Sequence, residues 1–478
     1  MAEPPRSDLV ALLDHAVGAW PDRPAWTFDD GTDVVTLTFA EVGARVGATA
    51  AGLVARGVGS GDRVAVMLDN RPELPLTWLA LHRLGAAMVP LNTRYRSVDA
   101  GHVVADSGTR LAVTSPAYAE VLRGLPGLEV VDAASLPVTE GAPSPLPAVE
   151  VDGRTTANVQ YTSGTTGRPK GCVLSHGYWT TLAGSLVDGF PRIGPDDVML
   201  TAQPFYYIDP QWNLVTAMLA GAHLVVLDGF HPSTFWAKAR EHRVTYFYCL
   251  ASMPTLLMKM PPDPLDRDHR VRVVQCSAIP PSAHAAIEER WGVGWYECFG
   301  MTETGADIRV TDDDHDELVG TGCLGRPAAH REARVVDGEL WLRGPGMMDG
   351  YLGLPDPFEE GGWFRTGDLA RIDDAGRVHL QGRLKDMIRR SGENVAAHEV
   401  EEVLTAHPAV RLAAVVGVPD EVRGEEVRAY VVAPGASAEE LTAWCRERLA
   451  SFKVPTSWVF RDELPLTASH RVAKAQLA

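Results

Sequence analysis

Cysteine is scarce in this sequence of 478 residues, and no two cysteines stand close together. The absence of any C-x-x-C pair argues against a zinc knuckle, and the wide spacing argues against a disulfide framework. We therefore expect a protein of a reducing compartment, the cytoplasm. The six positions are Cys172, Cys249, Cys276, Cys298, Cys323 and Cys445.

Excess basic charge and long apolar runs are also lacking. The formal net charge of −18 at pH 7 argues against nucleic acid or an anionic membrane as partner. The apolar stretch "AMLAGAHLVVL" (217–227) is too short to cross a bilayer and contains Gly and His. The first twenty residues, "MAEPPRSDLVALLDHAVGAW", have acids and prolines where a signal peptide needs a basic start and an apolar run, so we expect no export.

What remains is an ordinary globular composition, with 45% hydrophobic and 22% charged residues. The length predicts at least two domains. Apolar helix-like segments end at Gly85 and at Gly221, and each is followed by a short strand-like run. Further short apolar runs suit buried strands, so the sequence predicts α/β architecture with mostly parallel sheets. These runs are "RVAVML" (63–68), "TYFYCL" (245–250) and "VRVVQC" (271–276).

The chain changes character twice. Residues 116–153 are rich in Pro, Gly and Ala, and their second half is typical of a surface excursion. After Gly382 come a helical pattern, two strand-like runs and a second helical pattern, which predict a compact α+β unit of roughly a hundred residues. We place the domains at 1–383 and 384–478.

The stretch "YTSGTTGRPKG" (161–171) gathers four hydroxyls, three glycines and a lysine after a strand-like segment. Backbone N–H groups, hydroxyls and the Lys170 ammonium can together cradle polyphosphate oxygens. The spacing is not that of a Walker A loop, which needs G-x-x-x-x-G-K-[ST]. Taken alone, the stretch is equally compatible with a flexible turn.

Two further motifs decide between these readings: "YECFGMTETG" (296–305) and "GWFRTGDLARIDDAGRVHLQGRLKDMIRRSGENV" (362–395). Together with the first, they resemble the adenylate-forming superfamily of acyl-CoA synthetases, peptide-synthetase adenylation domains and luciferases. The resemblance covers nearly the whole chain. It implies a large amino-terminal domain that binds ATP and the acyl group, and a small mobile carboxyl-terminal domain.

The resemblance assigns the phosphate end of the site. It implies that Thr302 and Glu303 hold the α-phosphate and Mg²⁺, since a hard cation is usually shared between carboxylate and phosphate oxygens. Considered alone, an acid such as Glu303 is more often a solvated surface residue. The residues matching the loop around the β- and γ-phosphates are Thr162, Ser163, Gly164, Thr165, Thr166, Gly167 and Lys170.

The rest of the nucleotide site is implied in the same way. Asp368 matches the carboxylate that accepts both ribose hydroxyls, although a turn cap explains it equally well. Arg383 matches a nucleotide-contacting arginine, Lys385 the hinge, and Gly392 the loop lining the thiol donor's tunnel. The residues expected around the adenine and acyl pockets are Ser277, Ala278, Glu297, Cys298, Phe299, Gly300 and Met301.

The implied reaction is the ATP-dependent ligation of a carboxylic acid to coenzyme A. Attack of the carboxylate on the α-phosphorus gives an acyl adenylate and pyrophosphate, and a thiol then displaces AMP. The family's closing motif has a catalytic lysine after a glycine, whereas "LPLTASHRVAKAQL" has His470 and Arg471 there and Lys474 three residues later. Arginine does not replace lysine freely at a tight site.

Three readings stay open. In the first, the chain is a full ligase in which Arg471 or Lys474 supplies the cation. In the second, it performs one half-reaction, either thioester formation from an adenylate made elsewhere or adenylation with another acceptor such as an amine, nitrite or a carrier protein. In the third, it is a silent nucleotide-binding relative.

The acid is indicated only by aromatic residues. The segment "AQPFYYIDPQWN" (202–213) falls at the family's acyl-pocket wall, which places Tyr207 and Trp212 there, with Phe247 nearby. These side chains suit an apolar or aryl acid, but aromatic runs equally well form core. No feature sets the assembly, so monomer and homodimer both stay open.

Overall fold

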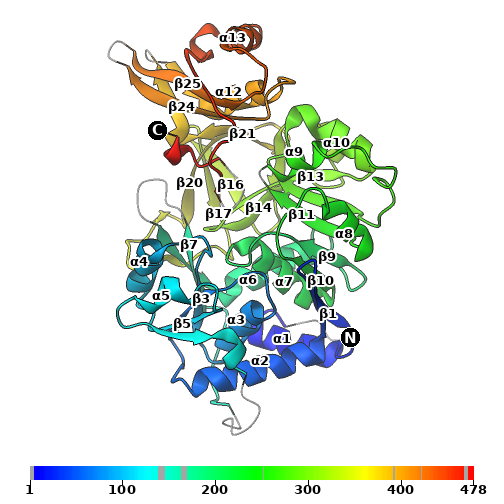
Figure 1. Cartoon of the computed structure of the whole chain (residues 1–478), viewed down its shortest axis with the longest axis vertical. Helices are drawn as coiled ribbons and strands as arrows, with labels where there is room; N and C mark the ends of the chain where they lie inside the picture. Colours follow the sequence, from blue (N-terminus) through cyan, green and yellow to red (C-terminus); the bar gives the residue numbers. More distant parts are fainter. Residues whose placement is uncertain are drawn as a thin grey trace.

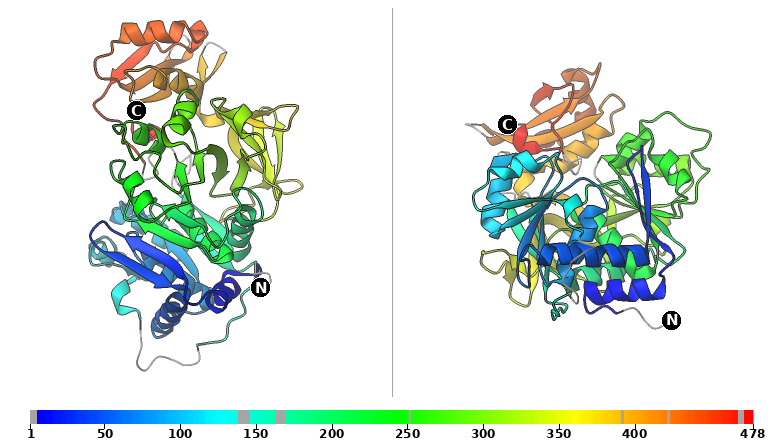
Figure 2. Two further views of the ribbon diagram at one scale, coloured as in Figure 1. Left: turned by 90° about the vertical axis from the view of Figure 1, so that its right-hand side faces the viewer. Right: turned by 60° about the horizontal axis from the view of Figure 1, so that its bottom comes forward.

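The computed structural model describes residues 5–137, 146–162, 169–250, 252–390, 393–420, 423–467 and 472–477. Figures 1 and 2 show a large body built from two sheets and their helices, with the carboxyl-terminal part, orange to red, set on one end of it. None of the helices in the described ranges has the length and hydropathy needed to cross a membrane.

The largest sheet has 14 strands in the described part of the chain, in the order β16-β17-β20-β21-β15-β14-β13-β12-β11-β9-β10-β1-β2, with β19 beside β20. Strands β13 to β1 along this path pair in parallel, and the strands on either side of them are antiparallel. The strands are β1 Pro24–Asp29, β2 Val34–Thr38, β9 Val198–Thr201, β10 His223–Leu227, β11 Tyr246–Leu250, β12 Val273–Ser277, β13 Trp295–Met301, β14 Gly305–Arg309, β15 Cys323–Pro327, β16 Glu332–Val336, β17 Glu339–Arg343, β19 Phe358–Glu359, β20 Trp363–Ile372 and β21 Val378–Arg383.

A second sheet has the order β18-β8-β7-β4-β3-β5-β6. Its strands pair in parallel from β7 to β6, while β8 and β18 are antiparallel additions. The expected parallel pairing is thus confirmed at the centre of both sheets, and the antiparallel edges make each sheet mixed. The strands are β3 Arg63–Met67, β4 Ala87–Pro90, β5 Leu111–Thr114, β6 Glu129–Asp132, β7 Thr156–Thr162, β8 Lys170–Ser175 and β18 Gly350–Tyr351.

Helices α3 (Glu73–Arg83) and α7 follow the predicted helix–glycine–strand pattern at Gly85 and Gly221. Helix α7 (Ile208–Ala220) is capped by Gly221 in the left-handed conformation, with φ +67°, and the chain then enters β10. A side chain at Gly221 would also collide with Trp20, so glycine is required there. The other helices are α1 Leu9–Ala19, α2 Phe39–Val54, α4 Ser97–Ser107, α5 Ala119–Arg123, α6 His176–Val187, α8 Phe235–Glu241, α9 Met253–Met258, α10 His284–Trp291 and α11 His315–Leu318.

The segment 116–153 contributes to the core before it becomes an excursion. Its first half forms α5 and β6, and β6 pairs with β5 at the edge of the second sheet. The second half includes residues 138–145, which lie outside the described residues, so the expectation of a surface excursion there remains a prediction.

The carboxyl-terminal part has its own sheet, order β23-β22-β25-β24 with β26 beside β25, and its own buried core around Ile388, Val400 and Leu441. It meets the large body beside β21, where α12 packs, and through a hydrogen bond of 3.0 Å from Lys259 Nζ to the carbonyl of Arg411. Its elements are β22 Met387–Arg390, β23 Glu393–Ala396, α12 Ala397–Thr405, β24 Leu412–Asp420, β25 Gly424–Val432, α13 Ala438–Arg446 and β26 Ser457–Phe460.

Candidate active site

The predicted phosphate loop begins and ends on paired strands. Thr162 is the last residue of β7 and Lys170 the first of β8, and the two are directly opposite in the antiparallel register. The intervening positions Ser163, Gly164, Thr165, Thr166 and Gly167 lie outside the described residues. The Lys170 ammonium nitrogen lies 5.1 Å above the centre of the Tyr351 ring, a cation–π contact that keeps this cation beside β18.

Glu303 faces the same place from the turn between β13 and β14. Its carboxylate is 9% exposed, and Oε1 accepts a hydrogen bond of 2.9 Å from the Tyr351 hydroxyl. Within the described ranges Oε2 accepts no hydrogen bond, so one hard carboxylate oxygen remains for a ligand beside the half-buried Thr302. This donor fits Mg²⁺, which prefers carboxylate and phosphate oxygens.

A buried ion pair fixes the turn that carries Glu303. Arg331 Nε donates to Asp307 Oδ1 at 2.7 Å, and both side chains are almost fully buried. Arg331 Nη2 donates to the carbonyl of Thr304 at 2.6 Å, and the Thr304 hydroxyl donates to Asp307. Breaking such a buried pair leaves an uncompensated charge, so this pair holds the turn in one position.

Glu297 acts on the site through the neighbouring loop. Its carboxylate accepts the backbone N–H groups of Ala278 and Ile279 at 2.7 and 2.9 Å. Ala278 has a φ of +71°, which is strained for a residue with a Cβ and is held there by these bonds. Burial raises the pKa of Glu297 to about 8, against the effect of the two N–H donors.

Cys298, the next residue of β13, points to the opposite face of the sheet from Glu297. Ser277 Oγ donates to the carbonyl of Cys298 at 2.7 Å, and the Tyr248 hydroxyl lies 2.9 Å from Ser277 Oγ. Gly300 comes so close to β14 that a Cβ would lie 2.0 Å from the carbonyl oxygen of Gly305. Glycine is therefore required at Gly300 for the strands to meet.

Asp368 and Arg383 are directly opposite on β20 and β21. Arg383 Nε lies 2.8 Å from Asp368 Oδ1, and the Asp368 side chain is 2% exposed. The backbone N–H of Asp368 donates to the Thr366 hydroxyl at 3.0 Å. The structure thus brings together Asp368, which the sequence analysis predicts at the ribose, and Arg383, which it predicts as a nucleotide-contacting arginine.

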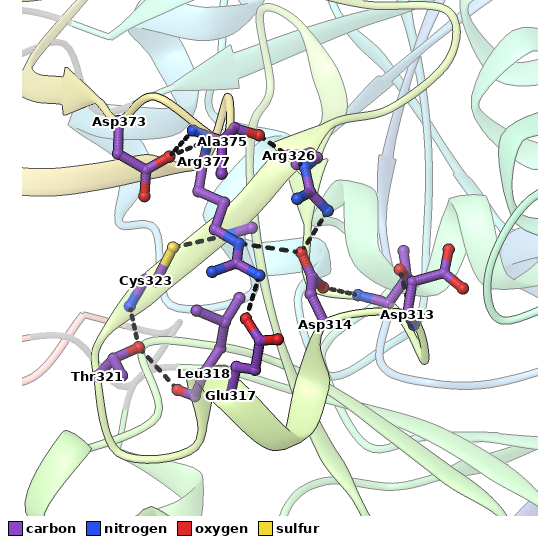
Figure 3. Close-up of polar contacts among 12 residues, drawn as sticks. Asp313, Asp314, Glu317, Leu318, Thr321, Cys323, Arg326, Asp373, Ala375 and Arg377 are labelled. Atoms are coloured by element: carbon purple, nitrogen blue, oxygen red, sulfur yellow. Dashed lines mark hydrogen bonds and ion pairs between the residues drawn. The ribbon is translucent and has the colours of Figure 1, made fainter.

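The far end of the β20–β21 hairpin is anchored by a cluster of charges (Figure 3). The buried carboxylate of Asp314 lies 2.8 Å from Arg326 Nη1 and 3.6 Å from Arg377 Nε. Arg377 Nη2 also pairs with Glu317 of α11 at 2.6 Å, and Arg326 Nε donates to the carbonyl of Ala375 at 3.0 Å. This cluster fixes the hairpin on which Asp368 and Arg383 lie.

The predicted hinge and cation lie in or next to the small domain. Lys385 belongs to the turn η3 (Leu384–Asp386), directly after β21, while Gly392 and Arg471 fall outside the described residues. Lys474, in η5 (Lys474–Gln476), pairs with Glu401 of α12 at 2.7 Å and with Asp386 at 3.5 Å. In this conformation the Lys474 ammonium is engaged by two acids of its own part of the chain.

A cavity of about 60 Å³ lies between α6, α7 and strands β11 to β14. This is several times the room one water needs, so it accepts a small organic group. Of the predicted pocket residues, Trp212, Ser277, Cys298, Phe299 and Gly300 line this cavity. Tyr207 and Met301 do not line it. The remaining lining residues are Leu182, Leu186, Ile208, Asp209, Tyr248, Gln275, Gly305, Ala306, Ile308 and Arg309.

Phe247, which the sequence analysis places near the acyl-pocket wall, does not line this cavity. Phe247 is fully buried on the other face of β11, where its ring packs 5.0 Å from Phe235 and 5.4 Å from Trp236. Successive side chains of a strand point to opposite faces, so its neighbour Tyr248 faces the cavity instead.

Comparison with known proteins agrees with this arrangement. Residues 13–352 match the AMP-binding enzyme family, and residues 399–471 match the AMP-binding enzyme C-terminal domain. The feruloyl-CoA synthase of an Amycolatopsis species is 34% identical over 497 residues, covering 98% of this chain and 99% of that protein. The sulfoacetate–CoA ligase of Cupriavidus necator is 34% identical over 504 residues, covering 98% of this chain and 97% of that protein.

The solved structures lead to the same family. The o-succinylbenzoate CoA synthetase of Bacillus subtilis, in complex with its acyl-adenylate intermediate, superimposes with a TM-score of 0.88 at 29% identity, covering 98% of this chain and 97% of that one. The same protein has been solved with ATP and a magnesium ion. ATP with Mg²⁺ and coenzyme A are the co-substrates of the CoA ligases. The chain belongs to the AMP-binding enzyme family, in its branch of AMP-forming carboxylate–CoA ligases.

Proposed function

We propose that this ligase activates an apolar or aryl carboxylic acid and transfers the acyl group to coenzyme A. The observation that carries the proposal is the meeting of Lys170, Tyr351 and Glu303 at one end of the site, with a largely apolar cavity beside the same β13–β14 turn. Positioning and charge neutralisation then supply most of the rate, since phosphoryl transfer offers little covalent chemistry to side chains.

The roles of the residues follow from their chemistry. Lys170 and the Thr162 hydroxyl contact phosphate oxygens, Thr302 contacts the α-phosphate, and Glu303 would hold Mg²⁺. The ion, when bound, neutralises charge on the phosphate oxygens. Asp368 accepts the ribose hydroxyls while Arg383 keeps its carboxylate in place. The loop residues Ser163 to Gly167, the adenine-pocket residues and Gly392 keep their predicted roles.

We also propose that the domains divide between Arg383 and Leu384, with Lys385 at the hinge. Strand β21 ends at Arg383, and the core of the small domain begins at Ile388. Few residues therefore separate the two cores, as a hinge between two half-reactions requires.

The test is release of pyrophosphate with ATP, Mg²⁺ and a panel of aryl and medium-chain acids, with and without coenzyme A. A parallel assay supplies preformed acyl adenylate. Release together with thioester formation supports the full ligase. No pyrophosphate release with ATP, together with thioester formation from the supplied adenylate, means that only the second half-reaction remains. Binding of ATP without either reaction means a nucleotide-binding relative without catalytic activity.

We propose a cytoplasmic protein, and we leave its assembly to experiment. All six cysteines are unpaired and five are buried, which suits a reducing cytoplasm. Light scattering of the purified protein decides between monomer and homodimer.

A further inference from the structure

The wall of the acyl cavity is mostly apolar but includes charged and polar side chains. Leu182 and Leu186 of α6, Trp212 of α7 and Ile308 of β14 supply the apolar surface. Arg309 and Gln275, which are 5% and 3% exposed, bring buried polar groups to the same wall, which also includes Asp209 and Ser277. Buried groups of this kind normally have all their hydrogen bonds satisfied.

Arg309 has more donors than acceptors. Its Nη1 donates to the carbonyls of Ser185 and Phe190 at 3.1 and 2.6 Å, and its Nη2 donates to the Ser185 hydroxyl at 2.9 Å. A guanidinium has five N–H donors, so two have no acceptor within the part of the chain that the structure describes.

Gln275 is short of partners in the same way. Its Oε1 accepts a hydrogen bond of 2.8 Å from the Tyr246 hydroxyl, and this bond fixes the orientation of the amide. Across the described residues, its Nε2 donates to no acceptor. The cavity therefore has donors without acceptors from two different strands, β12 and β14.

The charge of Arg309 is likewise uncompensated at close range. In the described ranges no carboxylate lies within 4.0 Å of it, and the nearby Asp307 is paired with Arg331 at 2.7 Å. Leaving a buried cation without a partner is costly, and a ligand that supplies an acceptor removes part of that cost.

We place the reacting carboxylate beside Glu303, in the turn just before Gly305. Arg309 is at the opposite end of β14, four residues beyond Gly305. At about 3.3 Å per residue this is roughly 13 Å, a distance that suits an aryl acid with a substituent opposite its carboxylate.

We propose that the acid carries a hydrogen-bond-accepting group at the end remote from its carboxylate, and that Arg309 and Gln275 bind this group. The inference rests on the proposed function and narrows its substrate class. Three near-isosteric substituents separate the possibilities: a para-isopropyl group without an acceptor, a para-acetyl group as a neutral acceptor, and a para-carboxyl group as an anionic one.

The experiment measures binding of non-hydrolysable acyl-sulfamate adenosine analogues of the three para-substituted cinnamates by calorimetry. We expect Kd for the acetyl or the carboxyl analogue to be at least about tenfold lower than for the isopropyl analogue. Equal Kd values, tighter binding of the isopropyl analogue, or no binding of any of them overturns the inference. The anionic and neutral arms identify which acceptor the site takes.

Two variants tie the preference to the named residues. In Gln275→Met and in Arg309→Gln, the ratio of Kd for the isopropyl analogue to Kd for the preferred acceptor analogue should fall toward one. The comparison in the wild type stands even where Arg309→Gln fails to fold. A preference that survives in folded forms of both variants overturns the assignment. Thioester formation with the free acids tests the proposed function separately, because its absence alongside a clear Kd preference contradicts the ligase reaction and leaves the cavity chemistry intact.

Discussion

Tyr351 connects the two ends of the phosphate site: its hydroxyl donates to Glu303 at 2.9 Å, and its ring lies 5.1 Å below the Lys170 ammonium. Burial and the neighbouring Glu303 charge raise the pKa of Tyr351, so the hydroxyl keeps its proton and remains a donor. One side chain thus orients the carboxylate proposed for Mg²⁺ and positions the cation proposed for the phosphates.

Tyr351→Phe should lower the apparent affinity for Mg²⁺ while keeping the ring beneath Lys170. A hydrogen bond to a charged group is worth about 1.5–3 kcal/mol, so the Mg²⁺ concentration for half-maximal pyrophosphate release should rise roughly tenfold or more. Tyr118→Phe is the matched control, because its hydroxyl donates to a different carboxylate, Asp69, at 2.5 Å. An equal response to Mg²⁺ in both variants would show that Tyr351 serves only packing.

The sequence predicts the strands and the motif residues, but not the side chains that contact those residues across the fold. The runs at 63–68, 245–250 and 271–276 became strands because each is short, apolar and β-branched or aromatic. In "TYFYCL" both faces are buried, so no alternation shows that Tyr248 and not Phe247 faces the cavity. Tyr351 and Arg309 carry no local signal at all, since Tyr351 meets its partner across 48 residues.

Replacing Asp368 should weaken binding of ATP through its ribose hydroxyls. In Asp368→Asn the amide accepts hydrogen bonds less strongly, and Arg383 loses its partner at 2.8 Å, so KM for ATP should rise at least tenfold. The specific test uses 2′-deoxy-ATP: the wild type should discriminate against it, and the variant should discriminate less. Unchanged discrimination in the variant would assign Asp368 to the hairpin alone.

We expect Arg471, and not Lys474, to supply the cation that adenylation needs. The Lys474 ammonium is paired with Glu401 at 2.7 Å and Asp386 at 3.5 Å, and moving it to the phosphates costs both contacts. Arg471→Ala should therefore lower pyrophosphate release by about a hundredfold or more while thioester formation from supplied adenylate continues. Lys474→Ala should lower release less than tenfold. The reverse order would assign the cation to Lys474.

Stability should fall in mild acid because two buried histidines are held neutral. Burial lowers the pKa of His176 from 6.5 to about 4 and also holds the pKa of His82 well below its usual value, and their rings lie 4.7 Å apart in the core. The unfolded chain then binds protons that the folded chain rejects. Above the unfolded pKa of about 6.5 this proton binding does not affect the free energy of unfolding. As pH falls from there toward 4, the free energy of unfolding falls by about 3 kcal/mol for His176 alone.

The measurement is urea unfolding at several pH values between 7.5 and 5, for the wild type and for His82→Leu. The free energy of unfolding of the wild type should fall with decreasing pH, and the variant should show a shallower fall because one of the two buried groups can no longer bind a proton. His231→Gln is the control, because that ring is 59% exposed beside Asp228. A slope in His82→Leu as steep as in the wild type would show that other groups, and not this buried pair, cause the acid sensitivity.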